Sequence, residues 1–432
     1  MKMEVGSENS LWQATAITLD SNPTLADEIH TDVVIVGAGF TGLRAALHLS
    51  ENKTNVVVLD KYDVGFGASG RNGGQVNPML PFNSPENIQK LIGNHYFENL
   101  CQASLNSADA LFEMIAKHKI DCQARQKGWL RVDHCEKARQ TSLHNAEGWI
   151  KYGAKMEPVE QAEVERLSGS SLYKSGIVAT RGGAVQPLSL ARGEAKAAIN
   201  LGAKIFSNSP VTAMKRQGDK WEVKTPQGKV TANWVVLASN GYTDDLHKGL
   251  AKTVMPLVSI QVATEPLHDQ QIGEILPEGH TISDTRRSIM YSRREPDNRI
   301  VFGGHGKLTN NGFVGFEHLI KDATRVFPSL NDVNWKFRWG GKIAITEDRL
   351  PHYHEPKPGL IVGLGFNGRG VAMSHVMGKC LADRILDLPV KQLPFPSTKI
   401  KGIPFWGIKM MGTGPVVSIM EILDKWESRS AD

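Results

Sequence analysis

The pattern of apolar and polar positions is most regular between residues 32 and 60, which read DVVIVGAGFTGLRAALHLSENKTNVVVLD. Two short apolar runs, at 33–36 and 56–59, flank a segment whose apolar residues recur at the spacing of one helix face. Short continuous apolar runs are typical of strands that are buried on both faces of a parallel sheet. The pattern therefore predicts a βαβ unit, with a tight turn between the first strand and the helix.

A similar order of strand, glycine turn and helix returns at residues 359–386, GLIVGLGFNGRGVAMSHVMGKCLADRIL. Between the two pieces, residues 86–118 and 136–168 have helical periodicity, and residues 256–340 alternate strand patterns with loops. One nucleotide-binding pattern in two separated pieces is best explained by a discontinuous domain.

The chain is too long for one simple core, so we expect two domains. The predicted fold class is α/β, with a Rossmann-type nucleotide-binding domain and an α+β second domain. The first domain is expected to comprise residues 30–80, 181–250 and 341–390, and the second residues 81–180 and 251–340. Residues 391–432 would form a C-terminal tail, and residues 1–30 an irregular arm.

Gly37, Gly39 and Gly42 form a GxGxxG motif directly after the first predicted strand and before the helix. Such a turn needs glycine for the tight bend, for the approach of a pyrophosphate and for close helix–strand packing. The helix N-terminus then favours the anion. Asp60 ends the second predicted strand, where an acid can accept a hydrogen bond from a ribose hydroxyl. The context favours a dinucleotide site over a glycine turn without a ligand.

The second glycine turn, Gly363, Gly365 and Gly368, has no second buried strand ending in an acid after its helix. A second nucleotide and a turn needed only for packing remain alternatives. We favour a helix start that approaches the flavin end of the same dinucleotide, because a helix N-terminus suits a flavin pyrimidine that becomes anionic on reduction. An NAD dehydrogenase needs no such closing turn, so FAD is favoured over NAD.

Composition narrows the functional classes. The net charge is only +5 and no dense Lys/Arg block occurs, so we expect no nucleic-acid partner. The four cysteines have no CxxC spacing, and we expect no metal site and a reducing, cytoplasmic location. The N-terminal residues lack the apolar core of a secretory signal, and no apolar run is long enough to span a membrane.

Four segments together resemble the FAD-dependent D-amino-acid-oxidase-like superfamily: VVIVGAGFTGLRAALHL with Asp60, GFGASGRNGGQ, GGAVQPLSLARGEAKAA and LGFNGRGVAMSHVMGKCLADRI. Over about residues 30–405 the chain is most similar to the gamma-glutamylputrescine oxidoreductases, and SGRNGGQ and DNRIVFGGHG are the more specific markers. The resemblance implies a glutathione-reductase-like FAD domain and a substrate domain whose antiparallel sheet covers the flavin.

The resemblance also implies which residues contact FAD. The pyrophosphate, ribose and adenine would lie against Gly37, Ala38, Gly39, Phe40, Thr41, Gly42, Asp60, Lys61 and Val211. The flavin would lie along Ser69, Gly70, Arg71, Asn72, Gly73, Gly74 and Gln75, and near Ser239, Asn240 and Gly241. Its pyrimidine end would meet Gly365, Phe366, Asn367, Gly368, Arg369, Gly370 and Val371.

Departures from the family pattern limit what can be carried over. Some relatives bind their flavin covalently through a Cys late in the chain or a His near the SGRN position. Here WGGKIAITEDRLP has no Cys, Cys380 lies within the last predicted helix, and GASGRNG has no His. We therefore expect non-covalent FAD. The place of a substrate-binding Lys is taken by Ala372, which argues against a simple α-amino-acid substrate.

The expected reaction is oxidation of an amine C–N bond to an imine that water hydrolyses, with the electron pair passing to FAD. A neutral amine needs no dedicated base. His305 is the best histidine candidate, although a lone His is more often structural. Tyr291, Trp339 and Phe366 are candidate walls of an apolar slot, with core packing an equal alternative. Arg369 is the first candidate for an anion contact, and Arg293 and Arg294 could hold a distant carboxylate.

These observations predict an amine oxidoreductase that acts on a γ-glutamylated polyamine or a related amine, with oxygen or a quinone as electron acceptor. The alternatives are an N-alkyl amino-acid oxidase or dehydrogenase, of the sarcosine or glycine type, and an electron-transferring flavoprotein subunit without its own substrate. The Trp- and Met-rich C-terminus could contact a membrane surface, but packing over the substrate domain is favoured.

Overall fold

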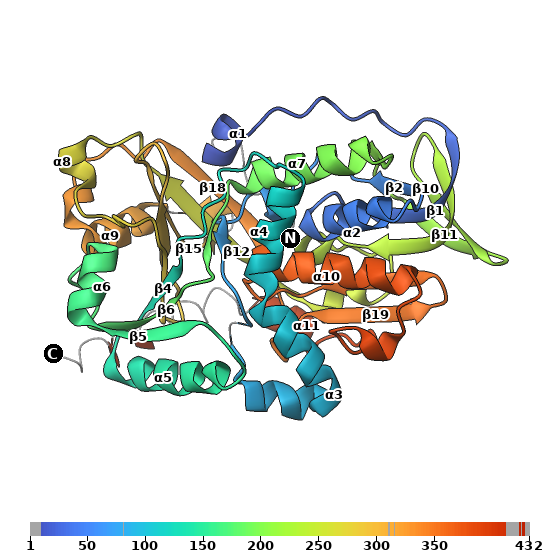
Figure 1. Cartoon of the computed structure of the whole chain (residues 1–432). Coiled ribbons are helices and arrows are strands. Elements are labelled where there is room, and N and C mark those ends of the chain that lie inside the picture. The colour runs from blue at the N-terminus through green and yellow to red at the C-terminus, as the bar shows by residue number, and fades with distance from the viewer. Residues whose placement is uncertain are drawn as a thin grey trace.

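The fold is that of a computed structural model, and the structure describes residues 10–80, 82–309, 312–314, 316–411, 423–424 and 426–427. Two eight-stranded sheets lie side by side (Figure 1). The first has the order β19-β20-β11-β1-β2-β8, and a β9–β10 hairpin pairs with β11. Its strands are β1 Glu28–Val36, β2 Val56–Leu59, β8 Lys204–Phe206, β9 Ala213–Gln217, β10 Lys220–Lys224, β11 Lys229–Leu237, β19 His352–Lys357 and β20 Leu360–Leu364.

Residues 33–35 of β1 and all of β2 are buried on both faces of the first sheet, as the apolar runs predicted. Strands β20, β11, β1, β2 and β8 are parallel. Val33 and Ile35 of β1 face a core shared with helices, whereas Val34 faces a second apolar cluster with Trp221 of the hairpin. Three helices cover the first face: α2 Phe40–Glu51, α7 Pro187–Asn200 and α10 Gly370–Ile385. The predicted βαβ unit is thus β1, α2 and β2.

The second sheet has the order β18-β12-β15-β14-β13-β4-β6-β5, and all its neighbouring strands are antiparallel except β13 and β4. Its strands are β4 Trp129–Val132, β5 Met156–Glu160, β6 Ser175–Ala179, β12 Met255–Ala263, β13 Thr281–Asp284, β14 Tyr291–Arg294, β15 Ile300–His305 and β18 Phe337–Ile345. The flanking helices are α5 Glu136–Ile150, α6 Gln161–Ser168, α8 Asp269–Ile272 and α9 Glu317–Val326. The pairing of a mostly parallel sheet with a mostly antiparallel one confirms the predicted fold class.

The remaining elements connect the two halves. Helices α3 Pro85–Leu105 and α4 Ser107–Lys117 pack on α10 and contribute to the first core. Strand β3 Gln75–Val76 pairs with β7 Gly183–Ala184, and β16 Lys307–Thr309 pairs with β17 Gly312–Val314. The predicted domain limits stay a prediction; β18 lies in the second sheet on both sides of the expected limit at residue 341.

The N-terminal arm is not wholly irregular. Residues 11–15 form the short helix α1 Leu11–Thr15, and the chain then crosses the molecule to reach β1 (Figure 1). Trp12 is fully buried beside Trp339. Helix α11 Trp406–Met411 follows α10 toward the C-terminus.

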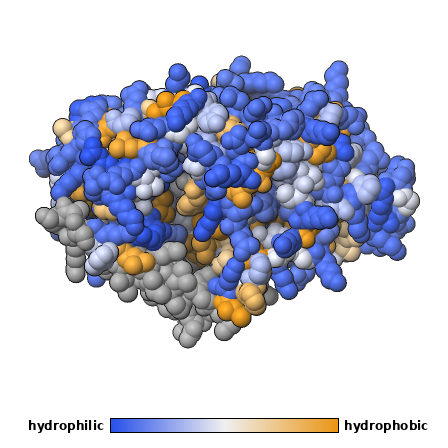
Figure 2. Space-filling model, turned by 90° about the horizontal axis from the view of Figure 1, so that it is seen from below, coloured by the Kyte–Doolittle hydropathy of each residue, from blue (hydrophilic) through white to orange (hydrophobic). Residues whose placement is uncertain are grey.

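The surface seen from below is mostly hydrophilic, with apolar residues in small groups (Figure 2). Within the described ranges, no helix combines the length and the apolar character that crossing a bilayer requires.

Candidate active site

The first glycine turn is shaped to receive an anion. Gly37 has φ +113°, and a Cβ there would lie 2.9 Å from Ala238 O. A Cβ on Gly42 would overlap Gly37 O, so glycine lets α2 start close to β1. The N-cap of α2 has no side-chain hydrogen bond, and the first turn holds no acidic residue. These features fit a pyrophosphate bound at the helix N-terminus.

Asp60 connects this turn to the end of β2. One carboxylate oxygen accepts a hydrogen bond from Ala38 N at 2.6 Å, and the other accepts one from Tyr62 N at 2.8 Å. Burial raises the pKa of Asp60 to about 6, although both backbone bonds oppose the rise. Each carboxylate oxygen keeps a further lone pair, which fits the expected ribose contact.

The segment 65–76, which we call the glycine loop, lies against the first turn. Ser69 Oγ accepts a hydrogen bond from Phe40 N at 2.9 Å, and a Cβ on Gly39 would stand 2.9 Å from that oxygen. Asn72 holds the loop together: its Oδ1 accepts from Gly74 N at 2.7 Å, and its Nδ2 donates to two loop carbonyls. The loop is therefore held in shape by its own hydrogen bonds, and its contact with FAD stays a prediction.

The glycines of this loop allow close packing against protein atoms. A Cβ on Gly73 would lie 2.7 Å from the Tyr291 ring, and one on Gly74, which has φ +65°, would overlap Arg293 and a backbone carbonyl. A Cβ on Gly65 would meet Leu188 at 2.9 Å. Much of the glycine content thus serves the contact between the loop, α7 and the second sheet.

Two buried tryptophans fix the far side of the loop. Trp339 Nε1 donates to Arg71 O at 3.1 Å, and Trp12 Nε1 donates to Asn72 O at 2.8 Å. Their rings meet edge to face with centroids 5.5 Å apart. The Arg71 guanidinium lies 4.3 Å from the Phe66 ring. Trp339 is fully buried, so its part in an open substrate slot stays a prediction.

The second glycine turn meets the end of β11. Gly365 and Gly368 both have φ +84°. Asn240 Oδ1 accepts a hydrogen bond from Gly365 N at 2.9 Å, and Asn367 Oδ1 accepts one from Thr346 N at 2.9 Å. Helix α10 follows with no side-chain N-cap and no acid in its first turn. The second turn therefore presents a helix start of the kind expected for the flavin pyrimidine.

Tyr291 is placed at the glycine loop by the second sheet. Its ring lies between Gly73 and Gly303, and its hydroxyl bonds Ser259 Oγ at 2.8 Å and Gln261 Nε2 at 2.5 Å. Burial raises the pKa of the Tyr291 phenol, which keeps it neutral. His305 lies at the end of β15, with its Nε2 at 3.2 Å from Arg287 O.

The remaining predicted contacts lie in segments that follow strands β2, β8 and β11 of the first sheet. Lys61 Nζ is 5.4 Å from the Tyr62 ring centroid. Val211 packs on the apolar cluster around Trp221, and Ser239 Oγ bonds Thr243 Oγ1 at 2.8 Å. Each of these cofactor roles stays a prediction.

Arg293 and Arg294 are held by internal bonds instead of facing an open site. The Arg293 guanidinium binds both oxygens of Glu295 and donates to Gly74 O at 2.8 Å and Val185 O at 2.6 Å. Arg294 donates to Asn298 Oδ1 at 2.7 Å. A role for Arg293 as a carboxylate receptor is therefore not supported, because its carboxylate partner is Glu295.

The sequence alone did not reveal a buried pair between α7 and α10. His375 Nε2 lies 2.6 Å from Glu194 Oε1, and both side chains are almost fully buried. The His375 ring also packs on Phe40, with centroids 5.1 Å apart. The pair joins three helices of the first core, and no local pattern links residues so far apart in sequence.

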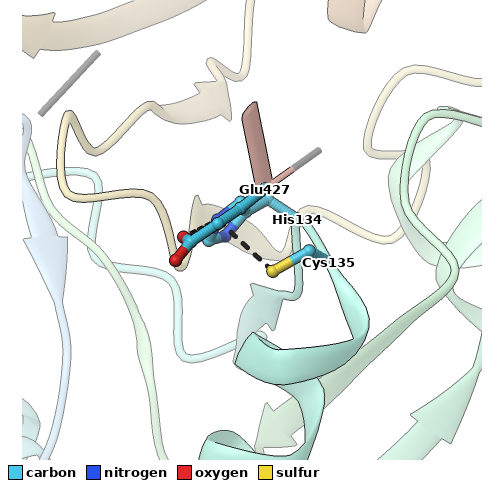
Figure 3. A group of neighbouring side chains, drawn as sticks. All are labelled: His134, Cys135 and Glu427. Atoms are coloured by element: carbon cyan, nitrogen blue, oxygen red, sulfur yellow. Dashed lines mark hydrogen bonds and ion pairs between the residues drawn. The ribbon is translucent and has the colours of Figure 1, made fainter. Parts of the chain in front are cut away.

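His134, Cys135 and Glu427 form a further cluster near the C-terminal segment (Figure 3). Their ligand atoms lie within 4.8 Å of one another. The Glu427 carboxylate already receives both arms of Arg287, at 2.7 and 3.0 Å. Arg287 also donates to Asp424 at 2.8 Å. We assign the cluster to an ion-pair contact that holds residues 424 and 427 on the second half.

Comparison with known proteins identifies relatives that match most of the length of the chain. A family model described as FAD dependent oxidoreductase matches residues 32–384. The chain is 32% identical to a probable oxidoreductase, OrdL, of Haemophilus influenzae, over 94% of each chain. It is 31% identical to the gamma-glutamylputrescine oxidoreductase of Escherichia coli, over 92% of this chain and 95% of the relative. The solved glycine oxidase of Geobacillus kaustophilus superposes with a TM-score of 0.73 at 21% identity, covering 87% of this chain and all of that one.

Proposed function

Because the chain belongs to the family of FAD-dependent oxidoreductases, we propose that it oxidises a γ-glutamylated polyamine, such as γ-glutamylputrescine, at an amine C–N bond. Family membership makes the chain an oxidoreductase that acts on amines or amino acids. The polyamine substrate is supported by the 31% identity with a gamma-glutamylputrescine oxidoreductase over most of both chains.

The observation that supports this proposal most is the meeting of four elements. Both glycine turns border the end of β11, at Ala238 and Asn240, and the glycine loop contacts the first turn through Ser69 and the second sheet through Tyr291. When bound there, FAD supplies the two-electron chemistry that converts an amine to an imine, which water hydrolyses to an aldehyde and an amine or ammonia.

The residues of the chain position the reactants. The first turn and Asp60 hold the dinucleotide, and the second turn directs a helix start toward the flavin. Tyr291 contributes a neutral phenol at the glycine loop, because burial raises its pKa and two side chains hold its hydroxyl.

We further propose that FAD is bound without a covalent link. The glycine loop contains neither Cys nor His. Cys380 is buried in α10, where burial raises its thiol pKa and the reactive thiolate is suppressed. Acid precipitation should release all the yellow colour into the supernatant. Flavin that stays with the pellet would contradict this binding mode.

A substrate panel separates the proposal from an N-alkyl amino-acid oxidase. The FAD-loaded protein is mixed anaerobically with γ-glutamylputrescine, putrescine, sarcosine and glycine, and flavin bleaching is followed. We expect the acylated diamine to bleach fastest. Faster bleaching by sarcosine or glycine would favour the amino-acid activity, and no bleaching by any amine would favour an electron-transfer subunit. Repeating turnover with oxygen or a quinone identifies the acceptor.

A further inference from the structure

A cavity beside the second glycine turn is lined by two arginines. Trp129 and Arg131 of β4 line it, together with Asn145 and Ala146 of α5 and with Arg369 of the turn. Its walls therefore come from both halves of the molecule. Arg369 immediately precedes α10, so the cavity adjoins the turn that we assign to the flavin end of the cofactor.

The strand pattern explains why a cation lies in this wall. Alternate side chains of a strand point to opposite faces. In β4, Leu130 and Val132 face the core of the second sheet, whereas Trp129 and Arg131 face the cavity. The strand thus places an aromatic ring and a guanidinium on one face, in contact with the other half of the protein.

Arg369 lies over the aromatic part of this wall. Its guanidinium carbon is 4.4 Å from the Trp129 ring centroid, and its Nε is buried without a hydrogen-bond partner. Burial, and secondarily Arg131, lowers the pKa of Arg369 to about 9, so the group is still charged at neutral pH. Across the part of the chain that the structure describes, no hydrogen bond or ion pair joins Arg131 or Arg369 to another side chain.

The two carboxylates that interact electrostatically with Arg131, those of Asp133 and Asp284, already have other hydrogen-bond partners. Asp133 accepts hydrogen bonds from Ser142 Oγ at 2.6 Å and Ser175 Oγ at 3.1 Å. Asp284 is paired with Arg286 at 2.5 Å. Two cations in a cavity without a dedicated acid of their own favour an anion there, and a guanidinium suits a carboxylate in particular.

We propose that Arg131 and Arg369 bind a carboxylate of the substrate that is remote from the amine being oxidised. This inference rests on the proposed function, and in γ-glutamylputrescine the group would be the α-carboxylate of the glutamyl unit. Trp129 contacts the Arg369 guanidinium at the cavity wall. The residues act on binding, so they select substrates that carry the acid at the end opposite to the reacting amine.

The first test uses two ligands and the unaltered holoenzyme. γ-Glutamylputrescine is compared with 4-aminobutanoylputrescine, which is the same molecule without the α-carboxylate. Loss of a hydrogen bond to a charged group costs enough to raise KM roughly 10- to 100-fold. We expect that rise with little change in kcat. Equal KM values for the two ligands would overturn the site.

The second test uses Arg131→Met and Arg369→Met, with Arg294→Met as the matched control because Arg294 binds Asn298 outside the cavity. In the cavity variants, KM for γ-glutamylputrescine should rise roughly 10- to 100-fold, whereas KM for the analogue should rise less than about threefold. A loss that is equal for both ligands would mean that the arginines act only on folding. Melting temperature and flavin spectrum verify that each variant is folded.

Calorimetry of glutarate binding to the oxidised holoenzyme separates the two proposals. Binding that is lost in Arg131→Met supports the carboxylate site even if no amine is turned over, in which case only the proposed function fails. Turnover of γ-glutamylputrescine with unchanged KM in both cavity variants would leave the function standing and refute the site.

Discussion

Replacing Gly74 by alanine tests whether the glycine loop is bare because protein atoms crowd it. Gly74 has φ +65°, and Gly218, in the β9–β10 turn, has φ +62°. An alanine at either position adopts a left-handed backbone, which costs about 1–2 kcal/mol. A Cβ on Gly218 has nothing within 4 Å, whereas one on Gly74 would overlap Arg293 and Val185 O. Gly218→Ala is therefore the matched control.

The extra cost at Gly74 follows from what the new methyl group must displace. Val185 O cannot move freely because Val185 N is bonded to Gly74 O at 2.9 Å. Moving Arg293 weakens buried hydrogen bonds from a charged group, which are worth about 1.5–3 kcal/mol each. Overpacking alone costs about 1–3 kcal/mol. We expect Gly74→Ala to lower the free energy of unfolding by about 3–6 kcal/mol, against about 1–2 kcal/mol for Gly218→Ala.

The assay is urea unfolding followed by tryptophan fluorescence, with bound FAD measured in the same samples. Gly74→Ala should also reduce the FAD content, because the loop lies against the first glycine turn through Ser69. Gly218→Ala should leave the FAD content unchanged. If both variants lost the same stability, the crowding argument would be refuted and only backbone conformation would account for the glycine.

Three further predictions concern stability and cofactor retention. Burial lowers the pKa of His354 to about 4, so the unfolded chain takes up this proton at a higher pH than the native state does. The free energy of unfolding should therefore fall by roughly 3 kcal/mol as the pH falls from about 6.5 to 4. Urea titrations should show a smaller loss in His354→Gln, and an identical loss would contradict the assignment. Glu194→Ala leaves His375 without its buried partner and should lower the free energy of unfolding by about 3–5 kcal/mol. The control, Glu165→Ala on the surface of α6, should lower it by less than about 0.5 kcal/mol. A similar loss for the two variants in urea unfolding would refute the buried pair. Asn240→Ala removes the acceptor for Gly365 N and should cost about 1–3 kcal/mol and weaken FAD binding in a fluorescence titration; an unchanged FAD Kd would show that the bond does not shape the turn.

The local features of the site could be predicted from the sequence because each depends on residues close together in the chain. Gly37, Gly42 and Asp60 lie in one βαβ unit, and the structure gives the first two the turn and packing roles expected of such glycines. The second glycine turn likewise follows its strand directly. In such units the order of strand, turn and helix determines the geometry.

Contacts between distant segments could not be predicted in this way. The resemblance implies only that the flavin lies along the glycine loop; it does not reveal that Tyr291 and Arg293 crowd this loop from a strand more than two hundred residues later. Arg293 is a candidate carboxylate receptor from the sequence alone, because the sequence does not show that its guanidinium donates hydrogen bonds to Glu295. The cavity of Arg131 and Arg369 also joins residues with no common sequence pattern. These features depend on the way the two sheets pack.

The most direct test of the central claim is anaerobic reduction of the FAD-loaded protein by γ-glutamylputrescine, with the products identified by mass spectrometry. We predict that the visible flavin band bleaches at a rate that saturates with substrate, and that an aldehyde or its cyclised form appears. A protein that binds FAD but is bleached by neither this compound nor any other N-acylated diamine would contradict the account.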